Sequence, residues 1–172
     1  MERTPRADAA DWLAAAAADP EACRREWERT GCGVTLLPAG RLWDVLLVPG
    51  ALGHLTLAAL AGLPGGGGPV FADFGDENIG FLVPVGTAAR WIGTGVRGAG
   101  YGTWVVIPHP AGRTRDAGPD GGRGVRWLLP PDGSGALIEP VLLELALHEA
   151  AASLYLRELD GRHPPDGPPD DL

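Results

Sequence analysis

Three carboxylates lie close together in the chain: Asp73, Asp76 and Glu77. Carboxylate oxygens are ligands that hard divalent cations such as Mg²⁺ prefer. Asp is also favoured in turns, because its side chain bonds to nearby backbone groups, and Asp76 and Glu77 fall in the turn-like run Gly-Asp-Glu-Asn. The cluster is therefore a candidate metal site, with a turn as the simpler interpretation.

The other residues that commonly carry out catalysis are scattered along the sequence. The histidines lack the spacing of a zinc site or an HExxH helix, so we expect structural or surface roles for them. The serines lie outside a nucleophile-elbow pattern. Cys23 and Cys32 flank an expected helix end, and we expect free thiols that pack rather than react. The scattered His and Ser residues are His54, His109, His148, His163, Ser134 and Ser153.

The charge of the chain limits its partners. The formal net charge is −8, and every basic residue is Arg. An acidic chain gains little from counterion release, so we do not expect nonspecific nucleic-acid binding, although a local Arg groove stays open. No apolar run is long enough to span a membrane and no signal-peptide pattern is present, so we expect a cytoplasmic protein without membrane contact.

Apolar periodicity and turn residues predict an α+β domain. It has a mixed or antiparallel sheet of about six strands, packed helices and a long C-terminal helix. Strands 34–37 and 43–48 should form a hairpin across a tight turn, as should strands 70–74 and 79–83. We expect strand 103–107 near the centre of the only sheet. The other expected elements are helices 7–18, 20–30, 51–61, 86–91 and 140–159 and strand 125–129.

The end of the chain divides into a helix and a tail. Apolar residues cover most of the circumference of helix 140–159, so we expect it to be buried in the fold, against a protein partner or in a homodimer. The Gly/Pro-rich loop 109–124 should be mobile. The composition of residues 161–172 predicts a disordered tail, which leaves residues 1–160 as the single domain.

Four stretches carry a resemblance to a known family. They are GVTLLP at residues 33–38, WDVLLVPG at 43–50, GDENIGFLVP at 75–84 and GVRGAGYGTWVVIP at 95–108, followed by WLLPP at 127–131. Over roughly residues 10–130 the chain resembles the primase–polymerase domain of the archaeo-eukaryotic primase superfamily. This is the bifunctional DNA primase/polymerase N-terminal domain, and the likeness is greatest to its short, stand-alone actinobacterial form. The resemblance implies the primase–polymerase fold.

The resemblance also implies what the chain lacks. The family's first motif supplies two alternating carboxylates for metal, and the matching positions here are Leu47 and Pro49. The family's nucleotide-contacting His falls at Asn78, and its third-motif Asp at Ala99. Nucleotidyl transfer needs carboxylate-held metal ions. We therefore expect a degenerate member whose polymerase activity is lost or very weak. Asp44 is the one catalytic carboxylate that a shifted alignment would retain. We expect Mg²⁺ or Mn²⁺ to bind only if the nucleotide site is retained.

Two functions follow from these expectations. In the first, a relic cleft binds a nucleotide or single-stranded nucleic acid, with arginines on phosphate and Tyr or Trp stacking on a base. In the second, the fold is a scaffold for a protein-interaction or regulatory module, which the charge of −8 and the absence of Lys favour. The candidate nucleotide-binding residues are Arg41, Asn78, Arg90, Arg97, Tyr101 and Trp104.

Overall fold

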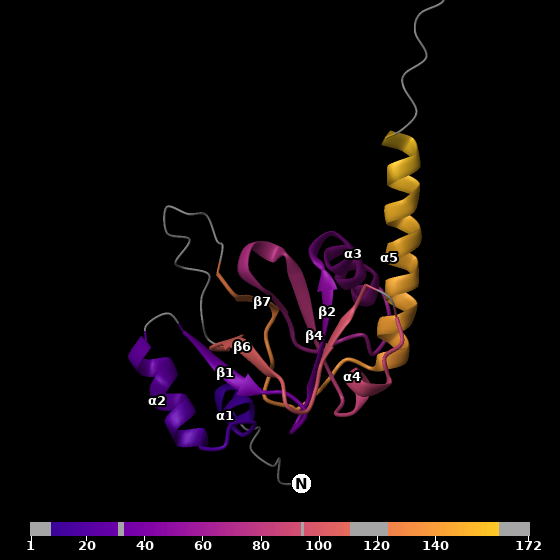
Figure 1. Ribbon diagram of the computed structural model, residues 1–172. Coiled ribbons are helices and arrows are strands. Elements are labelled where there is room, and N and C mark those ends of the chain that lie inside the picture. The colour runs from indigo at the N-terminus through magenta and orange to yellow at the C-terminus, as the bar shows by residue number, and fades with distance from the viewer. Residues whose placement is uncertain (1–7, 31–32, 94, 111–123, 162–172) are drawn as a thin grey trace, which may run out of the picture.

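The computed structural model of the chain describes residues 8–30, 33–93, 95–110 and 124–161. These residues form five α-helices and seven strands, and the strands pair into two antiparallel sheets (Figure 1). The predicted α+β fold with a long C-terminal helix is confirmed. The predictions for Cys32, for His163, for most of loop 109–124 and for the tail beyond residue 161 lie outside the described residues.

The larger sheet has five strands. Its order is β5 (Arg97–Ala99), β2 (Asp44–Pro49), β4 (Asn78–Val83), β3 (Val70–Ala72) and β7 (Arg126–Leu129). The predicted β3–β4 hairpin is confirmed, with the one-turn 3₁₀ helix η1 (Phe74–Asp76) at its tip. Most residues of β2 and β4 are buried, because both faces of the sheet are covered.

The smaller sheet consists of β1 (Val34–Pro38) and β6 (Trp104–Pro108), paired from Val34 with Pro108 to Pro38 with Trp104. Two sequence predictions are therefore wrong. β1 and β2 do not form a hairpin, and β6 does not lie at the centre of a single sheet. Between β1 and β2 the chain turns at Gly40, where φ is +83° and a Cβ would lie 2.3 Å from the backbone nitrogen of Tyr101. The backbone before β6 therefore leaves no room for a side chain at this turn, and the strand that follows, β2, pairs in the other sheet.

One face of the larger sheet packs on the smaller sheet and on the N-terminal helices α1 (Ala9–Ala14) and α2 (Pro20–Thr30). Val45 of β2 joins this core, together with Leu13 of α1 and Ile107 of β6. Helix α1 is shorter than the predicted 7–18, with Asp8 at its N-cap. The first core therefore holds the two sheets together.

The opposite face of the larger sheet packs on α3 (Gly50–Ala61) and α5 (Pro140–Gly161). Leu46, the neighbour of Val45, joins this second core with Leu60 of α3 and Leu143 of α5. Successive residues of a strand point to opposite faces, which explains how β2 serves both cores. A short helix, α4 (Thr87–Arg90), follows β4.

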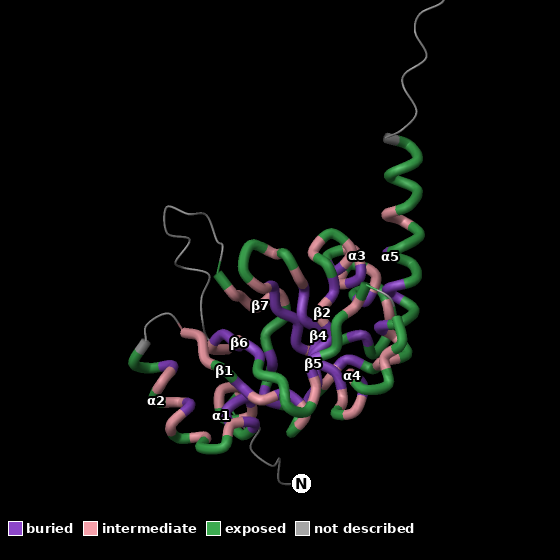
Figure 2. The backbone as a smooth tube through the Cα atoms, viewed as in Figure 1, coloured by how far each residue is buried: buried purple, intermediate pink, exposed green. Residues whose placement is uncertain are grey.

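Helix α5 runs along α3 and then extends beyond the rest of the described chain (Figure 1). The residues of its far half are almost all exposed (Figure 2). Among the described residues, no helix is both long and apolar enough to cross a membrane.

Candidate functional site

A cleft of about 270 Å³ lies between the two sheets. We call it the inter-sheet cleft. Leu47 of β2 and Phe71 of β3 line it from the larger sheet, and Val106 lines it from β6. The cleft results from the fold, because the consecutive strands β5 and β6 enter different sheets and lie on either side of it.

Three exposed side chains of suitable chemistry line the inter-sheet cleft. Trp104, the first residue of β6, is 61% exposed, and Phe74 of η1 is 60% exposed. Arg97, the first residue of β5, is also exposed, and its guanidinium makes no hydrogen bond or ion pair with any other described residue. Aromatic faces can stack on a base, and a guanidinium without a partner can bind a phosphate. The sequence predicted both Arg97 and Trp104 as site residues.

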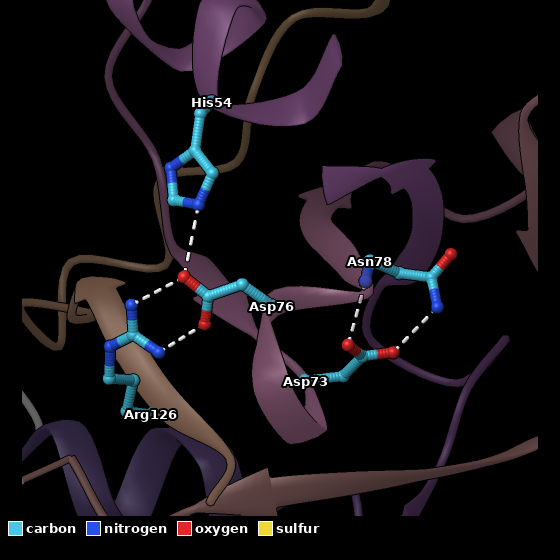
Figure 3. A network of polar contacts seen from close by, with 5 residues as sticks. All are labelled: His54, Asp73, Asp76, Asn78 and Arg126. Carbon is cyan, nitrogen blue, oxygen red and sulfur yellow. Dashed lines mark hydrogen bonds and ion pairs between the residues drawn. The ribbon is translucent and has the colours of Figure 1, made fainter. Parts of the chain in front are cut away.

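Asp73 also lines the cleft, but both of its carboxylate oxygens are occupied. They accept hydrogen bonds of 2.7 Å from the backbone nitrogen and the Nδ2 atom of Asn78 (Figure 3). Asn78, a candidate nucleotide-binding residue from the sequence, is thus held in place by Asp73. Within the described ranges, no three His, Cys, Asp or Glu side chains are grouped to hold a metal ion, and Asp73, Asp76 and Glu77 are included in that finding.

Asp76 belongs to a different group, which we call the Asp76 network. Its Oδ2 atom lies 3.0 Å from Nε2 of His54 on α3 and 2.7 Å from Nη2 of Arg126 on β7, and its Oδ1 atom accepts from Nη1 of Arg126 (Figure 3). The hydrogen bonds from Arg126 lower the pKa of Asp76, and the contact with His54 acts in the same direction against the effect of burial. In turn, the hydrogen bond to the Asp76 carboxylate raises the pKa of Arg126.

The Asp76 network fixes the turn that carries Phe74. Asp76 has φ of +58°, a left-handed conformation that costs free energy for a residue other than glycine. Sequence reasoning missed this network, since 22 residues separate Asp76 from His54 and 50 separate it from Arg126. No local pattern brings these three residues together.

Asp44, the candidate catalytic carboxylate, is buried. Its Oδ2 atom accepts hydrogen bonds from the backbone nitrogens of Gly86, at 2.8 Å, and Ala88, at 2.9 Å. Its Oδ1 atom is also buried and has no hydrogen-bond partner. These contacts hold the start of α4, and Asp44 does not line the inter-sheet cleft.

The remaining candidates lie elsewhere. Arg41 and Tyr101 are exposed but do not line the cleft, and Arg90 lines a separate pocket beside α5. The three candidate arginines therefore do not converge on one site. Cys23 is a buried free thiol whose pKa is raised by burial, against a hydrogen bond with Thr35 that lowers it. Such a thiol is a poor nucleophile at neutral pH.

No protein-family model, curated protein or solved structure significantly matches this chain. The geometry of the inter-sheet cleft and the chemistry of its residues are therefore the basis for a function.

Proposed function

We propose that the chain is a primase–polymerase-like domain that binds a nucleotide or a short single strand of nucleic acid in the inter-sheet cleft. The observation that carries this proposal is that Trp104 and Arg97 line the same cleft, with Phe74 beside them. Trp104 stacks on a base, and Arg97 binds a phosphate of the same ligand.

The chemistry of the cleft supports binding in preference to nucleotidyl transfer. Among the described residues, the one carboxylate that lines the cleft is Asp73, and its oxygens already accept from Asn78. A two-metal mechanism needs carboxylates that are free to hold metal ions. Since Asp44 is buried beneath α4, we propose that polymerase activity is lost or very weak.

The charge distribution favours a single strand or nucleotide over duplex DNA. Among the described residues, Arg97 is the cationic side chain that lines the cleft, whereas Arg41 and Arg90 lie outside it. Affinity for duplex DNA comes mostly from many phosphate contacts, and a chain of net charge −8 offers few of them. Base stacking contributes about 1–3 kcal/mol per base regardless of sequence. We therefore expect modest affinity with little sequence preference.

A thermal-shift titration tests this proposal. The ligands are ribonucleoside and deoxyribonucleoside triphosphates and a short oligothymidylate, each with and without Mg²⁺ or Mn²⁺. A ligand at about 100 times its dissociation constant stabilises the folded state by roughly 2.7 kcal/mol, or about 5–10 °C for a chain of this size. We expect a shift that does not depend on metal. A metal-dependent shift with triphosphate, followed by primer extension, would instead indicate a live polymerase site.

The alternative is a protein-interaction module built on the same fold. One observation favours it: several large apolar side chains on the far side of α5 are exposed, Leu145 and Tyr155 among them. Absence of a thermal shift with every nucleotide and oligonucleotide would favour this alternative.

A further inference from the structure

The side of α5 that points away from the core carries a row of side chains that are apolar or aromatic except for His148. Its members follow one another at alternating intervals of four and three residues, and all are exposed. Val141, Leu145 and Tyr155 have exposed fractions of 61%, 55% and 62%. An alternating interval of three and four is the spacing of the seam between two helices in a coiled coil. The row, which we call the α5 seam, comprises Val141, Leu145, His148, Ala152, Tyr155 and Leu159.

The α5 seam is separate from the face that packs in the protein. Leu143, Ala146 and Ala150 are buried in the second core. With 3.6 residues per turn, these positions lie on the opposite side of the helix from the seam. Helix α5 therefore has two apolar faces, and its own fold uses one of them. The second face extends for about 27 Å along the helix.

Acidic residues border the seam on both edges. By helical position, Glu144 and Glu158 lie along one edge, and Glu149 lies along the other. Arg157 falls on the side of the helix away from the seam. A second copy of α5 would place carboxylates against carboxylates in either the parallel or the antiparallel orientation, because the residues that flank a seam face those of the partner helix. This repulsion argues for a basic partner.

A pocket of about 480 Å³ adjoins the seam. Glu144 and His148 line it from α5, and the almost fully exposed Ile92 lines it from the segment after α4. A large apolar side chain from a helix on the seam can enter this pocket. The pocket lies along one edge of the seam and offers an anchor site for a large apolar side chain of a partner, the kind of contact that dominates binding energy in interfaces.

We propose that the α5 seam is the docking site for an amphipathic α-helix of another protein. This helix carries apolar residues at alternating intervals of three and four, with Lys or Arg on both flanks. The inference makes the interaction-module alternative specific. It stands independently of ligand binding in the inter-sheet cleft.

Three synthetic peptides of about 21 residues, or three heptads, test the proposal. The first has Leu at the seam positions and Lys at the flanks, the second has Glu at the flanks, and the third is a scrambled form of the first. Fluorescence anisotropy with the full chain measures their binding. We expect the Lys-flanked peptide to bind and to weaken as salt rises. Failure of this peptide to bind, or equal binding of the other two, would overturn the proposal.

Substitutions in the chain locate the surface. Leu145→Ser combined with Tyr155→Ser removes exposed side chains, so melting should change little while peptide binding weakens by at least about tenfold. Glu144→Gln with Glu149→Gln should weaken binding several-fold and flatten its salt dependence. Leu36→Ser, at an exposed apolar position on β1, is the matched control and should leave peptide binding unchanged. Unchanged binding by the double Ser variant would refute the proposal. So would a dimer of the full chain that the same substitutions dissociate, since the occupant would then be a second copy.

Discussion

Arg126 on β7 and Asp76 in the η1 turn form a two-pronged ion pair across 50 residues of sequence. The same carboxylate contacts His54 of α3, so one residue joins the turn to a strand and a helix. Phe74 lies in this turn and lines the inter-sheet cleft. The pair therefore connects the stability of the fold to the shape of the proposed binding site.

Replacing Asp76 tests the contribution of its charge. His54 is the other side-chain partner of Asp76, so the test starts from a protein that already carries His54→Gln. In that protein, Asp76→Asn should lower the free energy of unfolding by about 1–2 kcal/mol at pH 7, because charged hydrogen bonds to Arg126 are lost. The pKa of Asp76 is lowered in the folded state. Its stabilisation is thus complete above the ordinary Asp pKa of about 3.9 and is lost as pH falls through the lower, folded value.

Urea unfolding from pH 3 to pH 8 measures this effect. The difference between the His54→Gln protein and the variant that also carries Asp76→Asn should be constant above pH 5 and shrink below about pH 4. A difference that grows toward low pH would contradict the ion pair.

Gly50, the first residue of α3, should not tolerate a side chain. A Cβ there would lie 1.9 Å from the backbone oxygen of Asp76, and the Gly50 nitrogen already donates to Glu77 at 2.9 Å. Gly50→Ala should therefore destabilise the protein by about 1–3 kcal/mol, or roughly 2–12 °C in Tm. Gly67→Ala is the control, because a Cβ at Gly67 meets no atom within 4 Å. Equal melting temperatures for the two variants would show that the start of α3 is not in close contact with the turn at Asp76.

Asp44 should act in folding and not in ligand binding. Asp44→Ala removes the acceptor for Gly86 and Ala88, and we expect a loss of about 1–3 kcal/mol in unfolding free energy. Asp44→Asn should retain part of this stability, since its amide oxygen can accept the same bonds. Denaturant melts of both variants, alongside oligothymidylate binding by the folded proteins, separate the two roles. Weakened binding without lost stability would point to a site residue.

The sequence predicted the helices and strands better than it predicted which strands pair with each other. Helices α2, α3 and α5 and the β3–β4 hairpin follow from local signals: capping residues, apolar periodicity and turn residues. The pairing of β1 with β6 does not, because it joins distant segments and its selection depends on which faces bury apolar area. The turn at Gly40 is present, yet it leads into a different sheet.

The candidate site could be predicted in part for the same reason. Arg97 and Trp104 belong to one glycine-rich segment, so a sequence pattern suffices to select them. Phe74 joins them only in the folded chain, where η1 and β6 line the same cleft, and Arg41 and Arg90 lie outside that cleft. The Asp76 network lay beyond sequence reasoning, because its members come from three separate elements.

Fluorescence anisotropy of a labelled oligothymidylate tests the central claim most directly. Its arms are the unaltered chain, two cleft variants (Trp104→Ala and Arg97→Gln) and two matched controls outside the cleft (Tyr101→Ala and Arg41→Gln). We expect Trp104→Ala to weaken binding about 5- to 150-fold, the equivalent of a lost stacking contact. Arg97→Gln should weaken it and reduce its salt dependence. The controls should stay within about twofold of the unaltered chain. No binding by the unaltered chain, or equal weakening by all four substitutions, would contradict binding in the inter-sheet cleft.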